Sequence, residues 1–341
     1  MSPEVRAYHA SLPEYAPTPL VELPALAREL GVGRVFVKDE SSRLGLPAFK
    51  ALGATWAVHR ALAARGQAGD RAVTLVCATD GNHGRAVART ARLLGHRASW
   101  SWRRACIPTP SRRSPARARR WSRARSPTTT RLPGRRPAQA PDAILVQDMG
   151  WPGYEQIPAW IVEGYATLCA EADDQLAEAG ARAEPVVVPV GVGSFAQAVV
   201  THYRSRADGA APALLAVEPT AAACVLESPR RCADDRRDLR DRDGRAQLRH
   251  AVGARVAGAP RRLDAAVAVD DEEDLRAVRD MAALGVAGDR AGPRPRGLRA
   301  VLGGDDASAR RAALGLAPDA VVLLLNTEGA AANPHAARAG R

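Results

Sequence analysis

The chain has 341 residues, a formal net charge of +12 and an isoelectric point near 10.4, and this length favours two domains or one two-lobed α/β unit. No long apolar run indicates a membrane span, and the amino terminus lacks a signal-peptide pattern, so we expect a cytoplasmic protein with no membrane partner. The five cysteines show neither paired nor metal-ligand spacing, which fits a reducing compartment and predicts no metal site.

Strand and helix patterns alternate along the chain. In chain order we expect a helix over 23–30, a strand over 34–38, a helix over 49–64, a strand over 72–78, a helix ending at 94 and a strand over 144–147. A helix over 157–179, a strand over 185–190, a helix from 195 and strands over 213–217 and 321–325 follow. Glycine-rich turns after the strands predict a mostly parallel sheet, whose ligands would sit at the carboxyl ends of the strands.

The positive charge is concentrated in three windows. Residues 103–140 contain twelve arginines and no acid, residues 229–262 contain eleven arginines and five aspartates, and residues 289–298 contain three arginines and one aspartate. These windows carry more positive charge than the whole chain, so the remainder is net negative, as in an ordinary soluble enzyme. The basic character therefore belongs to the windows.

Two interpretations of the windows are open. They could be disordered basic inserts, since they lack apolar periodicity. They could also be translated out of frame, because GC-rich codons read in the wrong register give Arg, Ala, Pro and Gly. One synonymous coding sequence for residues 243–252, shifted by one base, reads Met-Ala-Gly-Leu-Asn-Cys-Gly-Thr-Pro. Residues 128–131, shifted and preceded by T, read Tyr-Asp-Asp-Ala. We favour the out-of-frame interpretation.

Lysine occurs in only one short segment of the chain. Lys38 and Lys50 are the only lysines, against 47 arginines. A guanidinium stays protonated, whereas a buried ε-amine can lose its proton and attack a carbonyl. Lys50 is therefore a candidate nucleophile, with chance survival of surface lysines as the alternative. Lys38 is better explained as an ion-pair partner of Asp39 or Glu40 at the end of a strand.

Four polar clusters are expected at strand ends. Lys50 begins a helix, and Asn82 in the turn 79–84 could donate to a bound oxygen. The turn 191–194 precedes a helix, where free N–H groups and the helix dipole attract a phosphate. A hydroxyl in residues 326–329 could form a hydrogen bond with a ring nitrogen of a bound ligand. Each turn alone is commonly only a turn, but an amine, a phosphate cradle, an amide and a hydroxyl together describe a pyridoxal phosphate site.

The motifs resemble those of the diaminopropionate ammonia-lyases, which belong to the fold type II class of pyridoxal phosphate enzymes related to tryptophan synthase β. The clearest are Phe49-Lys-Ala-Leu-Gly53 and Ala78-Thr-Asp-Gly-Asn-His-Gly-Arg85. Further matches are residues 15–20, 37–41, 146–148, 151–155, 191–194, 217–219 and 327–329. Threonine dehydratases and threonine synthases share the fold but usually have Ser in place of Asp80.

The resemblance implies a fold of two open, twisted, mostly parallel-sheet domains with the cofactor between them. The larger domain would comprise residues 1–75 and 165–341, and the smaller, substrate-closing domain residues 76–164. A homodimer is expected, as in that family.

The resemblance also implies a role for each site residue. Lys50 would bind pyridoxal 5'-phosphate covalently and then act as a base, and Asp80 would be a second base on the opposite face of the substrate. Asp148 would be an acid near the substrate amine. Cofactor contacts would come from Asn82 to the ring oxygen, from Gly191, Val192, Gly193 and Ser194 to the phosphate, and from Thr327 to the pyridine nitrogen. Alternatives are that Asp80 is only a helix N-cap, and that His83 is a turn residue bonded to backbone.

The implied reaction is α,β-elimination of 2,3-diaminopropionate to pyruvate and ammonia. One alternative is a related lyase that acts on serine or threonine. A different class is an inactive basic protein that binds nucleic acid through residues 103–136. We favour nucleic-acid binding less than the lyase function. The segment contains one aromatic residue, Trp121, and Trp102 directly precedes it, which is too few to form a stacking platform.

The windows replace segments that the resemblance assigns to the fold. Residues 103–140 would supply helices and strands of the smaller domain, residues 229–262 a loop that lines the cofactor, and residues 289–298 a turn beside it. Arginines in core positions carry a large desolvation cost. We therefore expect the chain as written to fold poorly or to bind its cofactor weakly.

The coding DNA tests the out-of-frame interpretation. Across residues 243–252, we expect a one-base shift of the reading frame to give the family-like sequence Met-Ala-Gly-Leu-Asn-Cys-Gly. Sequencing the coding DNA through all three windows checks this. Codons that give no family-like sequence in either alternative frame would contradict it and favour a basic insert.

Overall fold

The computed structural model describes residues 3–66, 72–79, 81–100, 142–206, 211–223, 225–226, 263–269, 308, 311–312, 314 and 316–332. The three arginine-rich windows lie outside these residues, and so does Asp80. What the sequence predicts for them stays a prediction.

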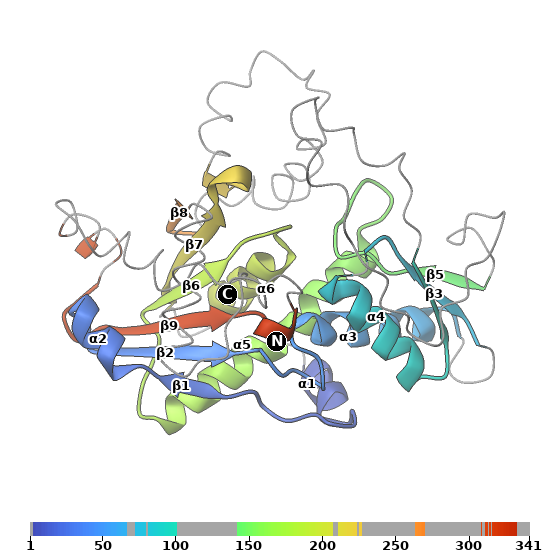
Figure 1. Ribbon diagram of the computed structural model, residues 1–341, viewed down its shortest axis with the longest axis horizontal. Coiled ribbons are helices and arrows are strands. Elements are labelled where there is room, and N and C mark those ends of the chain that lie inside the picture. Colours follow the sequence, from blue (N-terminus) through green and yellow to red (C-terminus); the bar gives the residue numbers. More distant parts are fainter. Residues whose placement is uncertain are drawn as a thin grey trace, which may run out of the picture.

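Two sheets lie at opposite sides of the molecule (Figure 1). The larger is six-stranded, in the order β1-β2-β9-β6-β7-β8, with β1 antiparallel to β2 and the other neighbours parallel. The smaller has the order β4-β3-β5 and is parallel. The mostly parallel α/β fold is thus confirmed, while the domain boundaries at 75/76 and 164/165 stay predictions. The strands are β1 Leu20–Glu22, β2 Arg34–Asp39, β3 Thr74–Cys77, β4 Arg97–Trp100, β5 Ala143–Leu145, β6 Pro185–Pro189, β7 Ala213–Pro219, β8 Ala265–Val269 and β9 Val321–Asn326.

Helices α2 to α6 agree with the sequence patterns to within a few residues. They are α1 Pro3–Ala10, α2 Pro24–Leu30, α3 Lys50–Ala64, α4 Asn82–Leu93, α5 Gln156–Glu178 and α6 Ser194–Arg204, with short 3-10 turns η2 Thr220–Ala222 and η3 Ala330–Ala332. Elements α1, β1, β4 and β8 were not predicted, because they are too short to show a clear periodicity. No described helix is both long and apolar enough to cross a membrane.

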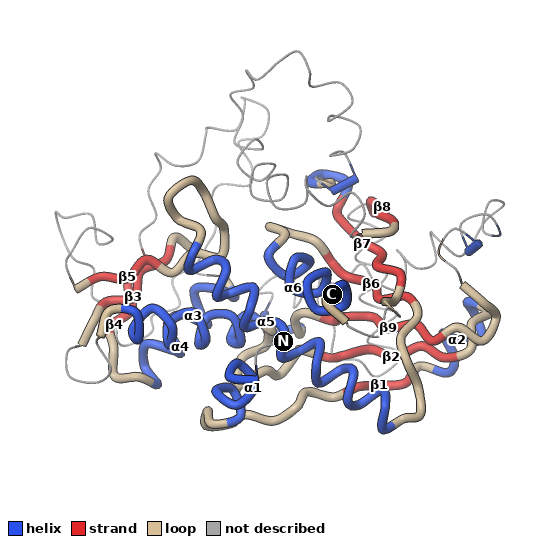
Figure 2. The backbone as a smooth tube through the Cα atoms, turned by 180° about the vertical axis from the view of Figure 1, so that it is seen from behind, coloured by secondary structure: helices blue, strands red, loops and turns tan. Residues whose placement is uncertain are grey.

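Both faces of the larger sheet are buried. Side chains alternate across a strand, so Val186 and Val188 of β6 pack into one hydrophobic cluster while Val187 packs into another. The first cluster lies against α3, α5 and α6, and the second lies against α2. Such continuous apolar strands are typical of parallel sheets covered by helices. Figure 2 shows the helices α3, α4 and α5 between the two sheets.

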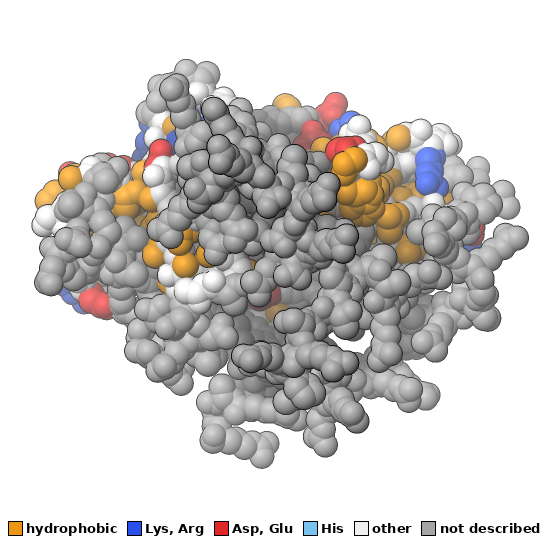
Figure 3. Space-filling model, turned by 90° about the horizontal axis from the view of Figure 1, so that it is seen from above, with side chains coloured by type: hydrophobic (Ala, Val, Ile, Leu, Met, Phe, Trp, Pro, Cys, Tyr) orange, Lys and Arg blue, Asp and Glu red, His pale blue; other side chains and the backbone are white. Residues whose placement is uncertain are grey.

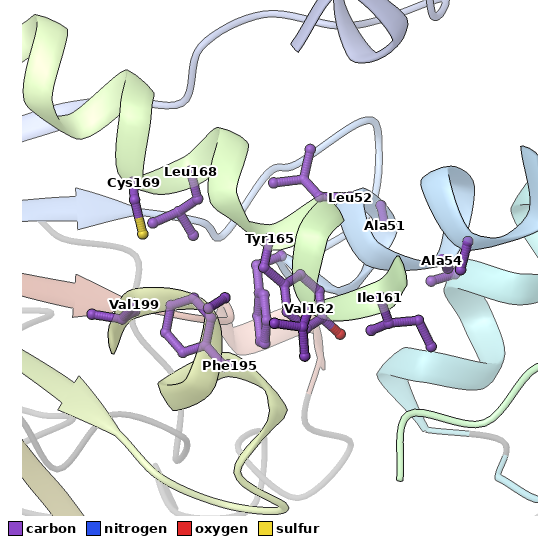
Figure 4. Packing of buried hydrophobic residues seen from close by; sticks show 14 of the residues in the cluster. Ala51, Leu52, Ala54, Ile161, Val162, Tyr165, Leu168, Cys169, Phe195 and Val199 are labelled. Atoms are coloured by element: carbon purple, nitrogen blue, oxygen red, sulfur yellow. The ribbon is translucent and has the colours of Figure 1, made fainter. Parts of the chain in front are cut away.

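Helices α3 and α5 cross at two glycines. A Cβ atom on Gly164 of α5 would lie 2.7 Å from the carbonyl oxygen of Leu52 and 2.9 Å from Cα of Gly53. A Cβ on Gly53 would lie 2.6 Å from Cε1 of Tyr165. Real Cβ atoms do not tolerate such distances, so glycine at both positions permits this close approach. Figure 4 labels Leu52 of α3 and Tyr165 of α5, which are next in sequence to the two glycines.

A buried ion cluster joins α5 to the end of β2. Glu171 of α5 accepts from Lys38 Nζ at 2.8 Å and from Arg43 at 2.7 Å, and all three side chains are fully buried. Arg43 also pairs with Glu40 at 2.6 Å. The expectation that Lys38 pairs with Asp39 or Glu40 is therefore wrong, since its ion-pair partner is Glu171. Sequence proximity could not reveal an acid on a distant helix.

Removing one charge from this cluster should destabilise the fold. Glu171→Gln leaves two buried cations with one carboxylate, and breaking a buried pair in this way costs about 3–5 kcal/mol. Urea unfolding measures the change. Glu163→Gln on the same helix is the matched control, because Glu163 is 34% exposed where it pairs with Arg60, and it should cost less than about 1 kcal/mol. Equal, small losses in both variants would contradict the structural role of the cluster.

Candidate active site

Lys50 is the first residue of α3, and its side chain points at a carboxylate. Its Nζ donates to Oδ2 of Asp148 at 2.8 Å. Asp148 follows β5, ninety-eight residues further along the chain. The side chains of Lys50 and Asp148 are 19% and 13% exposed, so the pair is largely shielded from water. The structure thus brings together two residues that the sequence analysis proposed separately.

The pair fixes its own charge state. Burial lowers the pKa of Lys50, but the Asp148 carboxylate outweighs this, and the pKa lies above its ordinary value. Burial raises the pKa of Asp148, but the Lys50 ammonium outweighs this, and the pKa lies well below its ordinary value. The resting site therefore contains an ammonium and a carboxylate. For Lys50 to act as a nucleophile or base, that carboxylate must take another cationic partner.

The loop before Asp148 is fixed by Tyr154. The Tyr154 hydroxyl donates to the Leu145 carbonyl at 2.8 Å and accepts from the Gln147 N–H at 2.8 Å. The Gln147 side chain in turn accepts from the Ala78 N–H at 3.0 Å. These bonds tie the turn after β5 to the end of β3 and thereby set the position of Asp148.

The turn between β6 and α6 is shaped for an anion. Gly191, Val192 and Gly193 lead into the helix, and Gly193 has φ +89°, a conformation that favours glycine. Ser194 begins the helix, and its buried Oγ has no hydrogen-bond partner among the described residues. Free N–H groups and the positive end of the helix dipole meet here, as in phosphate sites.

Three aromatic rings connect Lys50 to this turn. Phe49 precedes Lys50, and its ring centre lies 4.5 Å from that of Phe195, the residue after Ser194. Tyr165 of α5 lies 4.7 Å from Phe49 and 6.1 Å from Phe195. These ring contacts place the start of α3 and the amino end of α6 on the same aromatic cluster, of which Figure 4 labels Tyr165 and Phe195.

The segment after β9 connects Thr327 and Asn82 to the residue before Lys50. Thr327 is buried, and its carbonyl oxygen accepts from the Phe49 N–H at 3.1 Å. Asn82 begins α4, and its side-chain amide donates to Glu328. A chain of side-chain and backbone contacts therefore links Lys50 to Asp148, Asn82, Thr327 and the turn 191–194.

Helix α4 has Gly81 as its N-cap. Asp80 lies outside the described residues, so what the sequence predicts for it stays a prediction. His83 is buried and its Nε2 lies 2.9 Å from the Val146 carbonyl oxygen, which confirms the expected backbone bond, though within a helix and not a turn. Burial lowers the pKa of His83, so the ring is neutral at neutral pH and donates through Nε2.

These residues fit pyridoxal phosphate. A primary amine lies beside an aromatic cluster, and an unpartnered Ser194 hydroxyl at a helix start matches a phosphate. The family model described as pyridoxal-phosphate dependent enzyme matches residues 12–328. The chain belongs to the family of pyridoxal-phosphate dependent enzymes. Its fold is that of fold type II, and pyridoxal phosphate is the cofactor of the family.

The proteins to which this chain is similar include diaminopropionate ammonia-lyases, whose motifs it resembles. A diaminopropionate ammonia-lyase from Salmonella typhimurium is 37% identical over 252 residues, which cover 66% of this chain and 60% of the relative. The match thus spans about three-fifths of the length of that curated relative. A crystal structure of holo diaminopropionate ammonia lyase from Escherichia coli has a TM-score of 0.74 at 27% identity, covering 95% of this chain and 87% of that chain. The same E. coli enzyme in complex with D-serine has a TM-score of 0.73 at 25% identity, with coverages of 99% and 91%.

Several residues that contact this site were not predicted from the sequence. Tyr165 packs next to Lys50, Tyr154 positions Asp148, and Glu328 accepts from Asn82. A signal for Tyr165 was present, because a glycine inside a helix, as at Gly164 and Gly53, often marks a close approach. Tyr154 and Glu328 lie inside recognised motifs, but nothing in their spacing shows which groups they contact.

Loss of the Asp148 charge should make Lys50 reactive at lower pH. Asp148→Asn removes the carboxylate, which is the main group that raises the Lys50 pKa, while burial, which lowers this pKa, remains. The Lys50 pKa should therefore fall, and acetylation by acetic anhydride should reach half its maximal rate at lower pH. Mass spectrometry resolves the two lysines. Asp173→Asn is the control, since Asp173 pairs with His202 and Arg206 instead. An unchanged or raised midpoint in Asp148→Asn would contradict the pairing.

Proposed function

We propose that this chain catalyses α,β-elimination of 2,3-diaminopropionate to pyruvate and ammonia. The observation that carries the proposal is the Lys50–Asp148 pair beside the turn 191–194, in a chain that is 37% identical to a diaminopropionate ammonia-lyase over the matched region. Related enzymes that act on hydroxy amino acids usually have Ser at the position of Asp80. A carboxylate at this position supports an acid-base role for Asp80.

The chain's own residues would bind and orient the cofactor. The Ser194 hydroxyl and the N–H groups of 191–194 would bind the phosphate, the Asn82 amide would contact the ring oxygen, and Thr327 would face the pyridine nitrogen. When bound, pyridoxal phosphate supplies an electron sink for charge that develops at the substrate's Cα. The aromatic cluster of Phe49, Tyr165 and Phe195 would exclude water from one side of the amine.

Asp148 is suited to bind a substrate amine. In the structure its carboxylate already has a cationic partner, the Lys50 ammonium. Diaminopropionate has two amines, and one of them can replace Lys50 on Asp148, which frees the Lys50 amine to lose its proton. Lys50 would then take the Cα proton from one face and Asp80 from the other, so that both enantiomers are substrates. Matching such bases to the working pH contributes roughly 10²–10⁴-fold in rate.

The proposed setting is a cytoplasmic homodimer with a small amino acid as its ligand. The dimer rests on the family resemblance, and the cytoplasmic location rests on the cysteine spacing. Nucleic acid is not favoured as a partner. Charged side chains of both signs are visible among the described residues in Figure 3, and the segment 103–136, on which the nucleic-acid alternative depends, lies outside the described residues.

Substrate comparison with active-site variants tests the function. We expect ammonia and pyruvate to form faster from diaminopropionate than from serine or threonine. Lys50→Ala should abolish turnover and the borohydride-reducible link to the cofactor. Asp80→Asn should reduce turnover of one diaminopropionate enantiomer by about 10²–10⁴-fold and leave the other largely unchanged. Faster release from serine or threonine would replace the proposed substrate, and equal losses for both enantiomers would refute the two-base arrangement.

A further inference from the structure

His83 has a buried ring nitrogen without a partner. The residue is the second of α4, and its Nδ1 has no hydrogen-bond partner among the described residues. Its Nε2 lies 2.9 Å from the Val146 carbonyl oxygen, which can only accept, so Nε2 carries the proton and Nδ1 carries a lone pair. A buried acceptor without a donor is unfavourable for stability. It therefore indicates a donor that arrives with a ligand.

The His83 ring lies close to the Lys50–Asp148 pair. Val146, which holds the ring, is two residues before Asp148. Burial is the main cause that lowers the pKa of His83, the Asp148 carboxylate opposes it and the Lys50 ammonium reinforces it, so both charges act on the ring. The ring is neutral at neutral pH and is therefore an acceptor at Nδ1, not a source of protons.

The resting structure does not supply the missing donor. Lys50 donates to Asp148, yet its ammonium leaves Nδ1 of His83 unpaired. The His83 lone pair and the Asp148 carboxylate are both acceptors, and a single group can satisfy both of them only if it has at least two N–H or O–H donors. An ammonium has three such donors, whereas a hydroxyl has one.

We propose that Nδ1 of His83 accepts a hydrogen bond from the side-chain ammonium of the substrate when this ammonium replaces Lys50 on Asp148. His83 and Asp148 then form one binding site for an ammonium, and His83 determines specificity for diamino acids. The inference rests on the proposed function, because it states how that site recognises the second amine of its substrate.

Such a site discriminates against hydroxy amino acids. The hydroxyl of serine or threonine has one donor, and the charged Asp148 attracts it more strongly than the neutral ring of His83 does. Nδ1 then stays buried and unpaired, which reduces binding by roughly 10- to 100-fold.

Two variants of His83 test the specificity. In His83→Gln the terminal amide nitrogen can occupy the place of Nε2 and donate to Val146, but no acceptor remains at the place of Nδ1. In His83→Asn the shorter side chain brings its amide oxygen to the place of Nδ1. The ratio of kcat/KM for diaminopropionate to kcat/KM for serine should fall roughly 10- to 100-fold in His83→Gln and should be largely retained in His83→Asn. Equal losses for both substrates in His83→Gln, or an unchanged ratio, would overturn the proposal.

Nitrogen-15 NMR tests the contact itself without turnover. The probes are 1,2-diaminoethane and ethanolamine, which lack the substrate's carboxylate and differ only in an amine or a hydroxyl. In the cofactor-loaded protein, 1,2-diaminoethane should move the His83 Nδ1 resonance upfield, as expected when a lone pair accepts a hydrogen bond, and ethanolamine should not. His9 is the control, because it is also buried but both of its ring nitrogens have partners, so its resonances should stay in place. An unmoved His83 resonance, or equal shifts with both probes, would contradict the ammonium site.

The inference and the proposed function can fail separately. Turnover of diaminopropionate with an unmoved His83 resonance would refute the inference alone. A His83 shift with 1,2-diaminoethane, in a protein that releases no ammonia from diaminopropionate, would refute the function and support the ammonium site.

Discussion

The close contact of α3 with α5 at Gly53 and Gly164 is the constraint on which this site depends. Without side chains at these two positions, the helix backbones approach until Cβ atoms would clash. Lys50 lies one turn before Gly53, and Tyr165 directly follows Gly164. The two glycines therefore set the distance between the amine and the phenol ring that packs beside it.

The buried ion cluster contacts the same helix, α5, closer to its carboxyl end. Glu171 lies nearly two turns after Tyr165 and ties α5 to the end of β2 through Lys38 and Arg43. Burying the Glu171 carboxylate without a cationic partner would be too costly. Its pairing with Lys38 and Arg43 therefore fixes the position of α5. The chain's two lysines thus have different functions. One stabilises the helix against the sheet, and the other is the proposed reactive amine.

The sequence revealed the parts of the site that carry their own local signal. A scarce lysine, a glycine-rich turn before a helix and a Gly-Asn-His turn are each visible within a few residues. The contacts between them were not visible, because Lys50 meets Asp148 and Lys38 meets Glu171 across more than ninety residues. Short elements such as β1 and β8 were also missed, since three to five partly exposed residues give no periodicity to read.

The central claim is that the glycine contact positions Lys50 for its cofactor, and Gly164→Ala tests it most directly. The measurement is the fraction of chain that borohydride links to pyridoxal phosphate at Lys50. The account predicts a large loss of this link, because the added Cβ separates α5 from Leu52. Ala159→Gly on the exposed face of α5 should cost about 1 kcal/mol of stability yet leave the link intact. A Gly164→Ala chain that links cofactor as fully as the unaltered protein would contradict the account.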